Sequence, residues 1–168
     1  MTTALYIGRF QPLHKGHFEY MKKMLKEAEI LKIVIGSSQE IGTARNPFSV
    51  DERKEMLKLC FNDEKIAPER IRIFSAEDCP ESNELWLRNV LKLAGSSDIV
   101  YAGENKLVAR IFRNAGYDVR TLKRRIAGIS ATKIRRMIAA GKGWKIYVPE
   151  NVYDYVLKIK GDKRIKKL

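Results

Sequence analysis

The sequence contains few of the residues that build disulfide frameworks and metal centres. It has only two cysteines, Cys60 and Cys79, and two histidines in 168 residues. Two thiols are too few for a disulfide scaffold or a four-thiolate zinc site, so we expect both to be free. Long apolar runs are missing as well, because stretches such as Leu31 to Ile35 are broken by lysine and fall far short of the roughly 20 residues that span a bilayer. The first fifteen residues lack a signal-peptide pattern, and we expect a cytoplasmic location without membrane insertion.

Acidic residues are missing from one stretch of the chain. The protein as a whole has 33 lysines and arginines against 20 acids, a net charge of +13, yet residues 119–149 contain no acid at all. A basic stretch of this kind attracts a polyanion, which could be a nucleic acid or a phosphorylated small molecule. Its cations are Arg120, Lys123, Arg124, Arg125, Lys133, Arg135, Arg136, Lys142 and Lys145.

Short apolar runs alternate with amphipathic segments over most of the chain, which predicts strands alternating with helices. We expect an α/β fold, a single doubly wound Rossmann-like domain over residues 1–168 with a parallel sheet. Ser49 and Glu52 have the spacing of a capping box at the start of one helix. The expected strands are Ala4 to Gly8, Leu31 to Gly36, Ile71 to Ser75, Asp98 to Ala102 and Tyr117 to Leu122. The expected helices between them cover Phe18 to Ala28, Ser49 to Cys60, Glu84 to Leu93 and Leu107 to Asn114.

The alternation stops after residue 129. Thr132 to Ala139 and Pro149 to Lys158 predict two helices that complete the domain, and Lys160 to Leu168 is expected to be a basic surface tail. In such an open sheet the ligand lies beyond the carboxyl ends of the strands.

The most informative segment runs from Gly8 to His17 and follows the first strand directly. Gly8 permits close approach of a ligand, and Gly16 removes a side chain where the next helix begins and its free N–H groups point outward. His14 and His17 are three residues apart, so both imidazoles can face one anion. Two alternatives stay open for the histidines: half of a zinc site, and incidental surface residues. Neither a GxxxxGK[ST] loop nor a GxGxxG turn is present, so ATP would have to bind in another way.

A second segment, Gly128 to Arg136, begins a helix inside the basic stretch. Ser130 can cap this helix, which leaves Thr132, Lys133 and nearby backbone N–H groups to meet a phosphate, with Arg135 one turn further on. The alternative is a capped helix with a solvated basic face.

Together these segments resemble the nucleotidyltransferase superfamily, which has a His-x-Gly-His turn after its first strand and an Ile-Ser-x-Thr-x-Ile-Arg helix near its end. The chain is most similar to the archaeal type of nicotinamide-nucleotide adenylyltransferase. The further motifs that carry the likeness are Gly8-Arg9-Phe10-Gln11-Pro12, Gly36-Ser37-Ser38-Gln39, Arg45-Asn46-Pro47-Phe48 and Asn83-Glu84-Leu85-Trp86. The family's Gly-Asn-Pro after strand four is replaced here by Gly103-Glu104-Asn105-Lys106, which leaves the roles of Glu104 and Asn105 open.

The resemblance implies transfer of AMP from ATP to nicotinamide mononucleotide (NMN), giving NAD and pyrophosphate, with Mg²⁺ accompanying ATP and no tightly bound cofactor. It also implies roles for individual residues: His14 and His17 contact the ATP phosphates, with Arg9 and Arg135 clamping phosphates beside them. Further ATP contacts are implied for Gly8, Phe10, Gly16, Gly103, Ser130, Thr132 and Lys133. Contacts with NMN are implied for Arg45 at its phosphate, Asp78 at its carboxamide and Trp86 at its ring. Proteins of this family are commonly homo-oligomers.

Three other functions stay open from the sequence. The acceptor could be another phosphorylated cofactor precursor, such as FMN or phosphopantetheine, although Arg45 and Trp86 argue against this. The basic stretch could belong to a nucleic-acid-binding module, although no aromatic and basic stacking motif is present. A regulatory sensor that binds ATP without reacting is the third.

Overall fold

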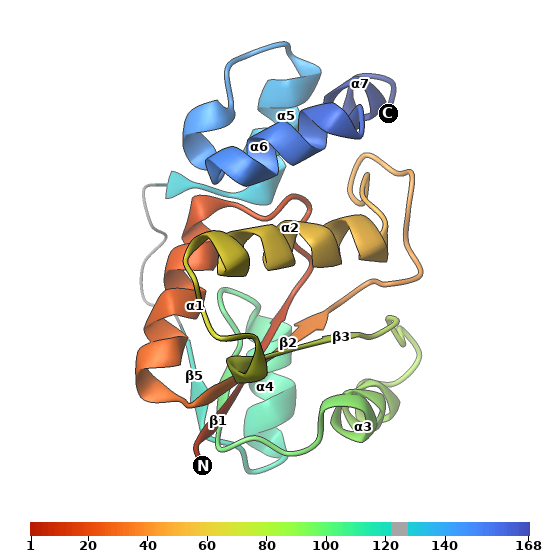
Figure 1. Ribbon diagram of the computed structural model, residues 1–168. Coiled ribbons are helices and arrows are strands. Elements are labelled where there is room, and N and C mark those ends of the chain that lie inside the picture. The colour runs from red at the N-terminus through yellow and green to blue at the C-terminus, as the bar shows by residue number, and fades with distance from the viewer. Residues whose placement is uncertain (122–127) are drawn as a thin grey trace. The chain divides into compact units, whose positions relative to one another are not determined.

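The computed structural model describes residues 1–121 and 128–168, and its strands form a five-stranded parallel sheet (Figure 1). The strand order is β3-β2-β1-β4-β5, and every neighbouring pair is parallel. This order defines a doubly wound sheet, so the predicted α/β class and topology are confirmed. Each strand lies within two residues of its predicted start. The strands are β1 (Thr3–Gly8), β2 (Ile30–Ile35), β3 (Ile71–Ser75), β4 (Ile99–Tyr101) and β5 (Val119–Arg120).

Helices follow the strands as the periodicity predicts, and local capping sets several of their starts. Ser49 accepts a hydrogen bond from the backbone N–H of Glu52 while the Glu52 side chain accepts one from Ser49, so the predicted capping box is present. Asn105 caps the helix after β4, which gives this residue a structural role that the sequence left open. The helices are α1 (Lys15–Glu27), α2 (Val50–Asp63), α3 (Asn83–Ala94), α4 (Lys106–Asn114), α5 (Ala131–Ala139), α6 (Glu150–Lys158) and α7 (Gly161–Ile165), with 3₁₀ turns at Pro68–Arg70 and Lys145–Tyr147.

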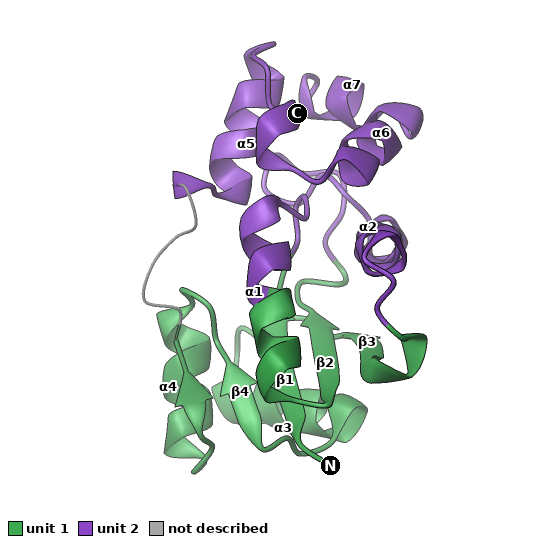
Figure 2. Ribbon diagram, turned by 60° about the vertical axis from the view of Figure 1, so that its left-hand side comes forward, with its two compact units in different colours: residues 1–9, 21–39, 67–124 green, residues 10–20, 40–66, 125–168 purple. Residues whose placement is uncertain are grey.

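The chain divides into two compact units, each assembled from three segments (Figure 2). The sheet unit comprises residues 1–9, 21–39 and 67–124, and the helical unit comprises residues 10–20, 40–66 and 125–168. We describe each unit by itself. The predicted single domain over residues 1–168 stays a prediction.

The sheet unit has a hydrophobic core between the sheet and the helices α3 and α4. Leu5, Val34 and Val100 from three neighbouring strands pack with Val90 of α3 and Phe112 of α4, all of them buried. All six residues of β2 are buried, as expected for a parallel strand covered on both faces. This packing fixes the carboxyl ends of the strands, where Gly8 and Gly103 lie.

The segment that we expected to be a basic surface tail contains a short helix with two buried residues. Residues 161–165 form α7, in which Gly161 and Ile165 are buried. Five cations among the last nine residues obscure this packing in the sequence, because one glycine and one isoleucine make too short an apolar pattern to indicate a buried face.

The basic stretch is partly neutralised within the units. Arg120 forms ion pairs with Glu27 and Asp118 in the sheet unit, and Lys145 pairs with Glu150 at 2.8 Å in the helical unit. Lys123, Arg124 and Arg125, together with the predicted end of the fifth strand at Leu122, lie outside the described residues. In the part of the chain that is described, both cysteines are free, and no helix has the length and apolar character needed to cross a membrane.

Candidate active site

The histidine turn is fixed at the start of α1. His14 lies just before the helix, and its Nδ1 accepts a hydrogen bond from the backbone N–H of His17 at 3.2 Å. Because a ring nitrogen that accepts carries no proton, the neutral tautomer of His14 has its hydrogen on Nε2. His14 thus caps the helix with one nitrogen and keeps the other as a donor.

His17 lies in the first turn of α1, because this helix begins at Lys15 and not at Phe18 as the periodicity predicted. Its ring packs between the rings of His14 and Phe10. The imidazoles of His14 and His17 stack with centroids 3.5 Å apart and planes 16° apart, and Phe10 meets His17 edge-on at 5.0 Å. Burial, with a further contribution from His14, lowers the pKa of His17 well below its ordinary value of 6.5. His17 Nδ1 is buried and has no hydrogen-bond partner among the residues described. The protein therefore holds the two imidazoles face to face, and the lowered pKa of His17 keeps its ring neutral at pH 7.

Gly16 is required by this stacking. A Cβ atom added to Gly16 would lie 3.0 Å from Nδ1 and 3.1 Å from Cε1 of His14, closer than ordinary van der Waals contact. Any larger residue would push the His14 ring away from the N–H group that it caps. The structure thus adds a packing reason for this glycine, and its predicted contact with ATP stays a prediction.

The start of α5 has the capping that the sequence predicts. The Ser130 hydroxyl accepts a hydrogen bond from the backbone N–H of Lys133 at 3.2 Å. The first amides of a helix have no intrahelical acceptor, and the helix dipole places partial positive charge there. With the Thr132 hydroxyl beside them, these amides form a local setting suited to an anion.

Arg135 joins the start of α5 to the histidine turn. Its side chain is 9% exposed; Nη1 donates to the backbone oxygen of Gln11 at 2.8 Å and Nε to that of Ala44 at 2.9 Å. Gln11 belongs to the turn that carries His14, so these two motifs, 124 positions apart, lie against each other within the helical unit. The guanidinium also contacts Thr132 Oγ1 at 3.4 Å. The sequence did not predict that Arg135 donates hydrogen bonds to the backbone of Gln11 and Ala44. Its role as a phosphate ligand stays a prediction.

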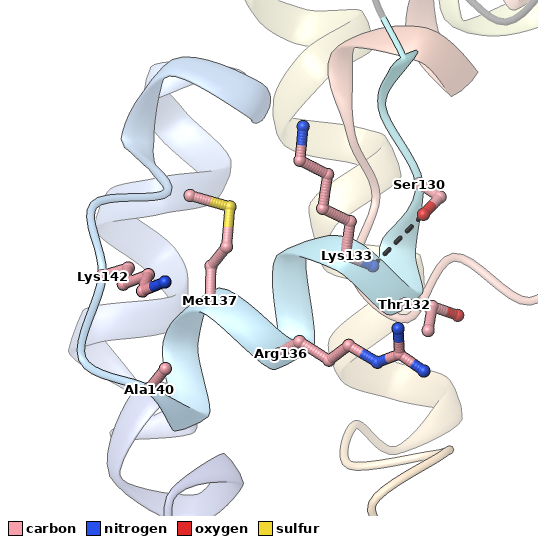
Figure 3. Close-up of a pocket in the computed structure, with 7 residues that line it drawn as sticks. All are labelled: Ser130, Thr132, Lys133, Arg136, Met137, Ala140 and Lys142. Carbon is pink, nitrogen blue, oxygen red and sulfur yellow. Dashed lines mark hydrogen bonds between the residues drawn. The ribbon is translucent and has the colours of Figure 1, made fainter.

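A hollow of about 630 Å³ runs along α5, and several of its lining side chains are cationic (Figure 3). Arg136 follows Thr132 by four positions and so shares its helix face, while Lys133 Nζ lies 4.6 Å from the centroid of the Tyr147 ring. No acidic side chain is among the described residues that line the hollow. Its residues are Ser130, Thr132, Lys133, Arg136, Met137, Ala140 and Lys142.

Arg136 and Lys142 were not singled out as site residues by the sequence. Both belong to the acid-free stretch of residues 119–149, so that stretch was the available signal. A count of charges cannot distinguish a lysine that faces the hollow from one, such as Lys145, that is paired with a carboxylate.

Arg45 lies in the loop between β2 and α2, within the helical unit, and its side chain is exposed. The backbone around it is bonded on both sides, by Arg135 at Ala44 and by a turn in which the N–H of Asn46 donates to Thr43 Oγ1 at 3.0 Å. The guanidinium has no ion pair with a carboxylate among the residues described. It is therefore an available cation on a fixed loop.

The remaining predicted site residues belong to the sheet unit. Gly8 ends β1; Gly103 follows β4 with a positive φ of 56°, which favours glycine. The N–H of Asp78 donates to Gln39 Oε1 at 3.1 Å, which joins the loops after β3 and β2. Trp86 on α3 is half-buried against the core, edge-on to Phe112 at 6.2 Å. The roles of these residues and of Arg9 with substrates stay predictions.

The zinc alternative for the histidines finds no support in the described part of the chain. No group of three or more histidine, cysteine, aspartate or glutamate side chains is placed there to hold a metal ion. His14 Nδ1 already accepts a backbone hydrogen bond, and His17 Nδ1 is buried beside Phe10.

Comparison with known proteins gives consistent results. The model of the cytidylyltransferase-like family matches residues 5–137. A nicotinamide-nucleotide adenylyltransferase of Saccharolobus solfataricus is 39% identical over all of this chain and 97% of its own length, and one of Thermococcus kodakarensis is 36% identical over 98% of this chain and 87% of its own. Among solved structures, a bifunctional NMN adenylyltransferase/ADP ribose pyrophosphatase of Francisella tularensis, in complex with AMP and a manganese ion, has a similar fold. Its TM-score is 0.82 at 24% identity over 99% of this chain and 51% of that one.

Proposed function

Because this chain belongs to the cytidylyltransferase-like family and has full-length relatives that are nicotinamide-nucleotide adenylyltransferases, we propose that it transfers AMP from ATP to NMN, forming NAD and pyrophosphate. An oxygen of the NMN phosphate attacks the α-phosphorus of ATP. The new P–O bond forms as the bond to the β-phosphate oxygen breaks, and pyrophosphate leaves with the electron pair. The acceptor brings its own nucleophile, so the protein has to align two polyanions and stabilise the growing charge.

The helical unit supplies donors for that task. We propose that His14 Nε2 and His17 donate to the ATP phosphates, and that Thr132 and the first amides of α5 bind the β- and γ-phosphates. Lys133 and Arg136 add positive charge along the hollow of Figure 3, where the departing pyrophosphate accumulates charge. Arg9 and Arg135 complete the phosphate contacts.

The acceptor contacts follow the same family likeness. We propose that Arg45 binds the NMN phosphate, because it is an exposed cation without an acidic partner among the described residues. Trp86 stacks on the nicotinamide ring, where a cationic pyridinium over an indole is worth about 0.5 to 2 kcal/mol. Asp78 orients the carboxamide, and Gly103 lies at the adenosine ribose.

ATP enters as its complex with a divalent ion, for which we propose Mg²⁺. Mg²⁺ keeps several waters and is usually bound through substrate phosphates with one or two carboxylates, so it does not require a cage built by the protein. When bound, the ion neutralises phosphate charge. The residues of this chain bind and orient the phosphates around it. We further propose a homo-oligomer in the cytoplasm.

One observation carries the proposal: the hydrogen bond from Arg135 to the Gln11 backbone places the histidine turn against the start of α5. A site for a triphosphate needs donors from both. The test is a chromatographic assay of purified protein with ATP, Mg²⁺ and a panel of NMN, FMN and phosphopantetheine. We expect NAD, with kcat/KM for NMN about 100-fold or more above the others. Equal or reversed rates would refute the choice of acceptor.

The other two functions predict no NAD in this assay and a different result in binding measurements. A nucleic-acid-binding module would bind RNA with strong salt dependence and transfer no adenylyl group. A sensor would bind ATP tightly without releasing pyrophosphate. The ion pairs of Arg120 and Lys145 reduce the free positive charge that would support the nucleic-acid alternative.

A further inference from the structure

The last helix of the chain packs directly against the loop that carries Arg45. We refer to residues 43–48 as the Arg45 loop. Gly161, at the start of α7, is buried so closely against it that a Cβ atom there would lie 2.6 Å from Cε1 of Phe48. Arg164 lies over the Phe48 ring, with its guanidinium carbon 6.0 Å from the ring centroid. The Arg45 loop and α7 both belong to the helical unit, and α7 packs along one side of the loop.

Arg164 adds a directed contact to this packing. Its Nη1 donates to the backbone oxygen of Pro47 at 2.9 Å and to Glu52 Oε2 at 2.7 Å, and its Nη2 donates to Glu52 Oε1 at 2.8 Å. Glu52 also accepts from the N–H of Ser49 at 2.9 Å, so one guanidinium joins the end of the Arg45 loop to the start of α2. Burial raises the pKa of Glu52, but the hydrogen bonds from Arg164 and Ser49 outweigh it and leave that pKa below its ordinary value.

The other side of the loop is bonded to the histidine turn. The Gln11 side chain donates through Nε2 to the oxygen of Phe48 and accepts its N–H through Oε1, both at 2.9 Å. Arg135 holds the oxygen of Ala44. The loop is therefore fixed from two directions. On one side are Gln11 of the histidine turn and Arg135 of the proposed triphosphate site, and on the other is α7, which belongs to neither.

We propose that α7 acts through Arg164 as a positioning element for Arg45, and so controls the binding of the mononucleotide phosphate. This inference rests on the proposed function, because it takes Arg45 as the ligand of that phosphate. Arg164 donates to the backbone oxygen of Pro47, two residues beyond Arg45. We do not propose that Arg164 itself binds a substrate. It acts by fixing the peptide groups from which the Arg45 side chain extends.

The size of the effect expected on replacing Arg164 can be estimated from the cost of misplacing a group that orients substrate. A displacement of about 1 Å at a group that orients substrate costs about 100-fold in rate. Loss of Arg164 removes neither the Gln11 nor the Arg135 contact, so we expect the Arg45 loop to shift and not to detach from the histidine turn. We expect a smaller effect, about 10-fold, concentrated in the KM for NMN.

The experiment compares Arg164→Met and Arg164→Lys with Lys163→Met. Lys163 is the exposed neighbour of Arg164 on α7, which makes it a control for the loss of one positive charge. KM and kcat are measured for NMN and for ATP below the melting temperature of each variant. Arg164→Met is expected to raise KM for NMN about 10-fold and to change KM for ATP less than threefold. The lysine of Arg164→Lys can bond to one of the two acceptors, Pro47 or Glu52, but not to both at once. Its KM for NMN is therefore expected to lie between those of wild type and Arg164→Met.

Arg164→Met leaves the Glu52 carboxylate without its partner and could unfold the protein. The double variant Arg164→Met, Glu52→Gln removes that charge while keeping an oxygen for the Ser49 N–H, so it serves as the second test. If melting temperature falls but KM for NMN stays within twofold of wild type in both, Arg164 is only structural and the proposal is overturned. Equal increases of KM for NMN and ATP would also overturn it.

Hydrogen exchange separates this inference from the proposed function. The amide of Phe48 is bonded to Gln11 and that of Asn46 to Thr43, and both report on the Arg45 loop without any substrate. Faster exchange at these amides in Arg164→Met than in Lys163→Met supports the positioning role. Unchanged exchange refutes it, even in an active enzyme. Failure of the wild-type protein to make NAD would instead refute the proposed function.

Discussion

Replacing Gly16 by alanine tests the histidine turn with the smallest possible change. The new Cβ would lie 3.0 Å from His14 Nδ1, so the imidazole has to move by a few tenths of an ångström and loses its bond to the His17 N–H. Loss of a cap costs about 0.5 to 2 kcal/mol, but alanine in place of glycine inside a helix returns up to about 1 kcal/mol. The two effects nearly cancel, and we expect the melting temperature to stay within about 4 °C of wild type.

Activity should respond much more strongly than stability. A displaced His14 no longer presents Nε2–H at its position in the stack, and removal of one donor to developing charge costs about 100- to 1000-fold in rate. Because the ring is moved and not deleted, we expect kcat/KM for NAD synthesis to fall about 10- to 100-fold. Gly143→Ala is the control, because a Cβ at Gly143 meets nothing within 4 Å. A Gly16→Ala enzyme with at least a third of wild-type activity would refute the reasoning.

The other predictions concern charge, protonation and stacking. Arg136→Met should weaken ATP binding about 10-fold in calorimetry, whereas Arg110→Met, an exposed arginine on α4, should not. The pKa of His17 is lowered in the folded protein, so below pH 6.5 the unfolded chain takes up a proton that the native protein does not; the unfolding free energy should then fall by up to about 1.4 kcal/mol per pH unit. Urea unfolding at pH 6.5 and 5.5 should show this loss in wild type and a smaller one in His17→Gln. Trp86→Leu should raise KM for NMN about 10-fold, and an unchanged KM would remove Trp86 from the acceptor site.

The sequence predicted those features whose causes are local. The strand boundaries follow from apolar runs, and the capping box of Ser49 and Glu52 and the cap at Ser130 follow from spacings of three residues. The family motifs also indicated the two segments for which we propose phosphate binding, because each combines a helix start with residues suited to an anion.

The features that the sequence missed depend on backbone acceptors and on long-range packing. Arg135 and Arg164 donate to the carbonyl groups of Gln11, Ala44 and Pro47, and every residue carries a carbonyl, so no side-chain pattern reveals these partners. The burial of α7 likewise depends on Phe48, more than a hundred positions away. The sequence predicted Arg135 as a phosphate ligand and placed Arg164 in a basic surface tail. The structure adds that both arginines donate hydrogen bonds to backbone oxygens of loops.

The most direct test of the account is a crystal structure of the protein with α,β-methylene-ATP. The account predicts that the triphosphate lies between the histidine turn and the start of α5, with phosphate oxygens about 3 Å from His14 Nε2 and from a backbone N–H in the first turn of α5. A nucleotide bound away from both segments, or in contact with one and not the other, would contradict it.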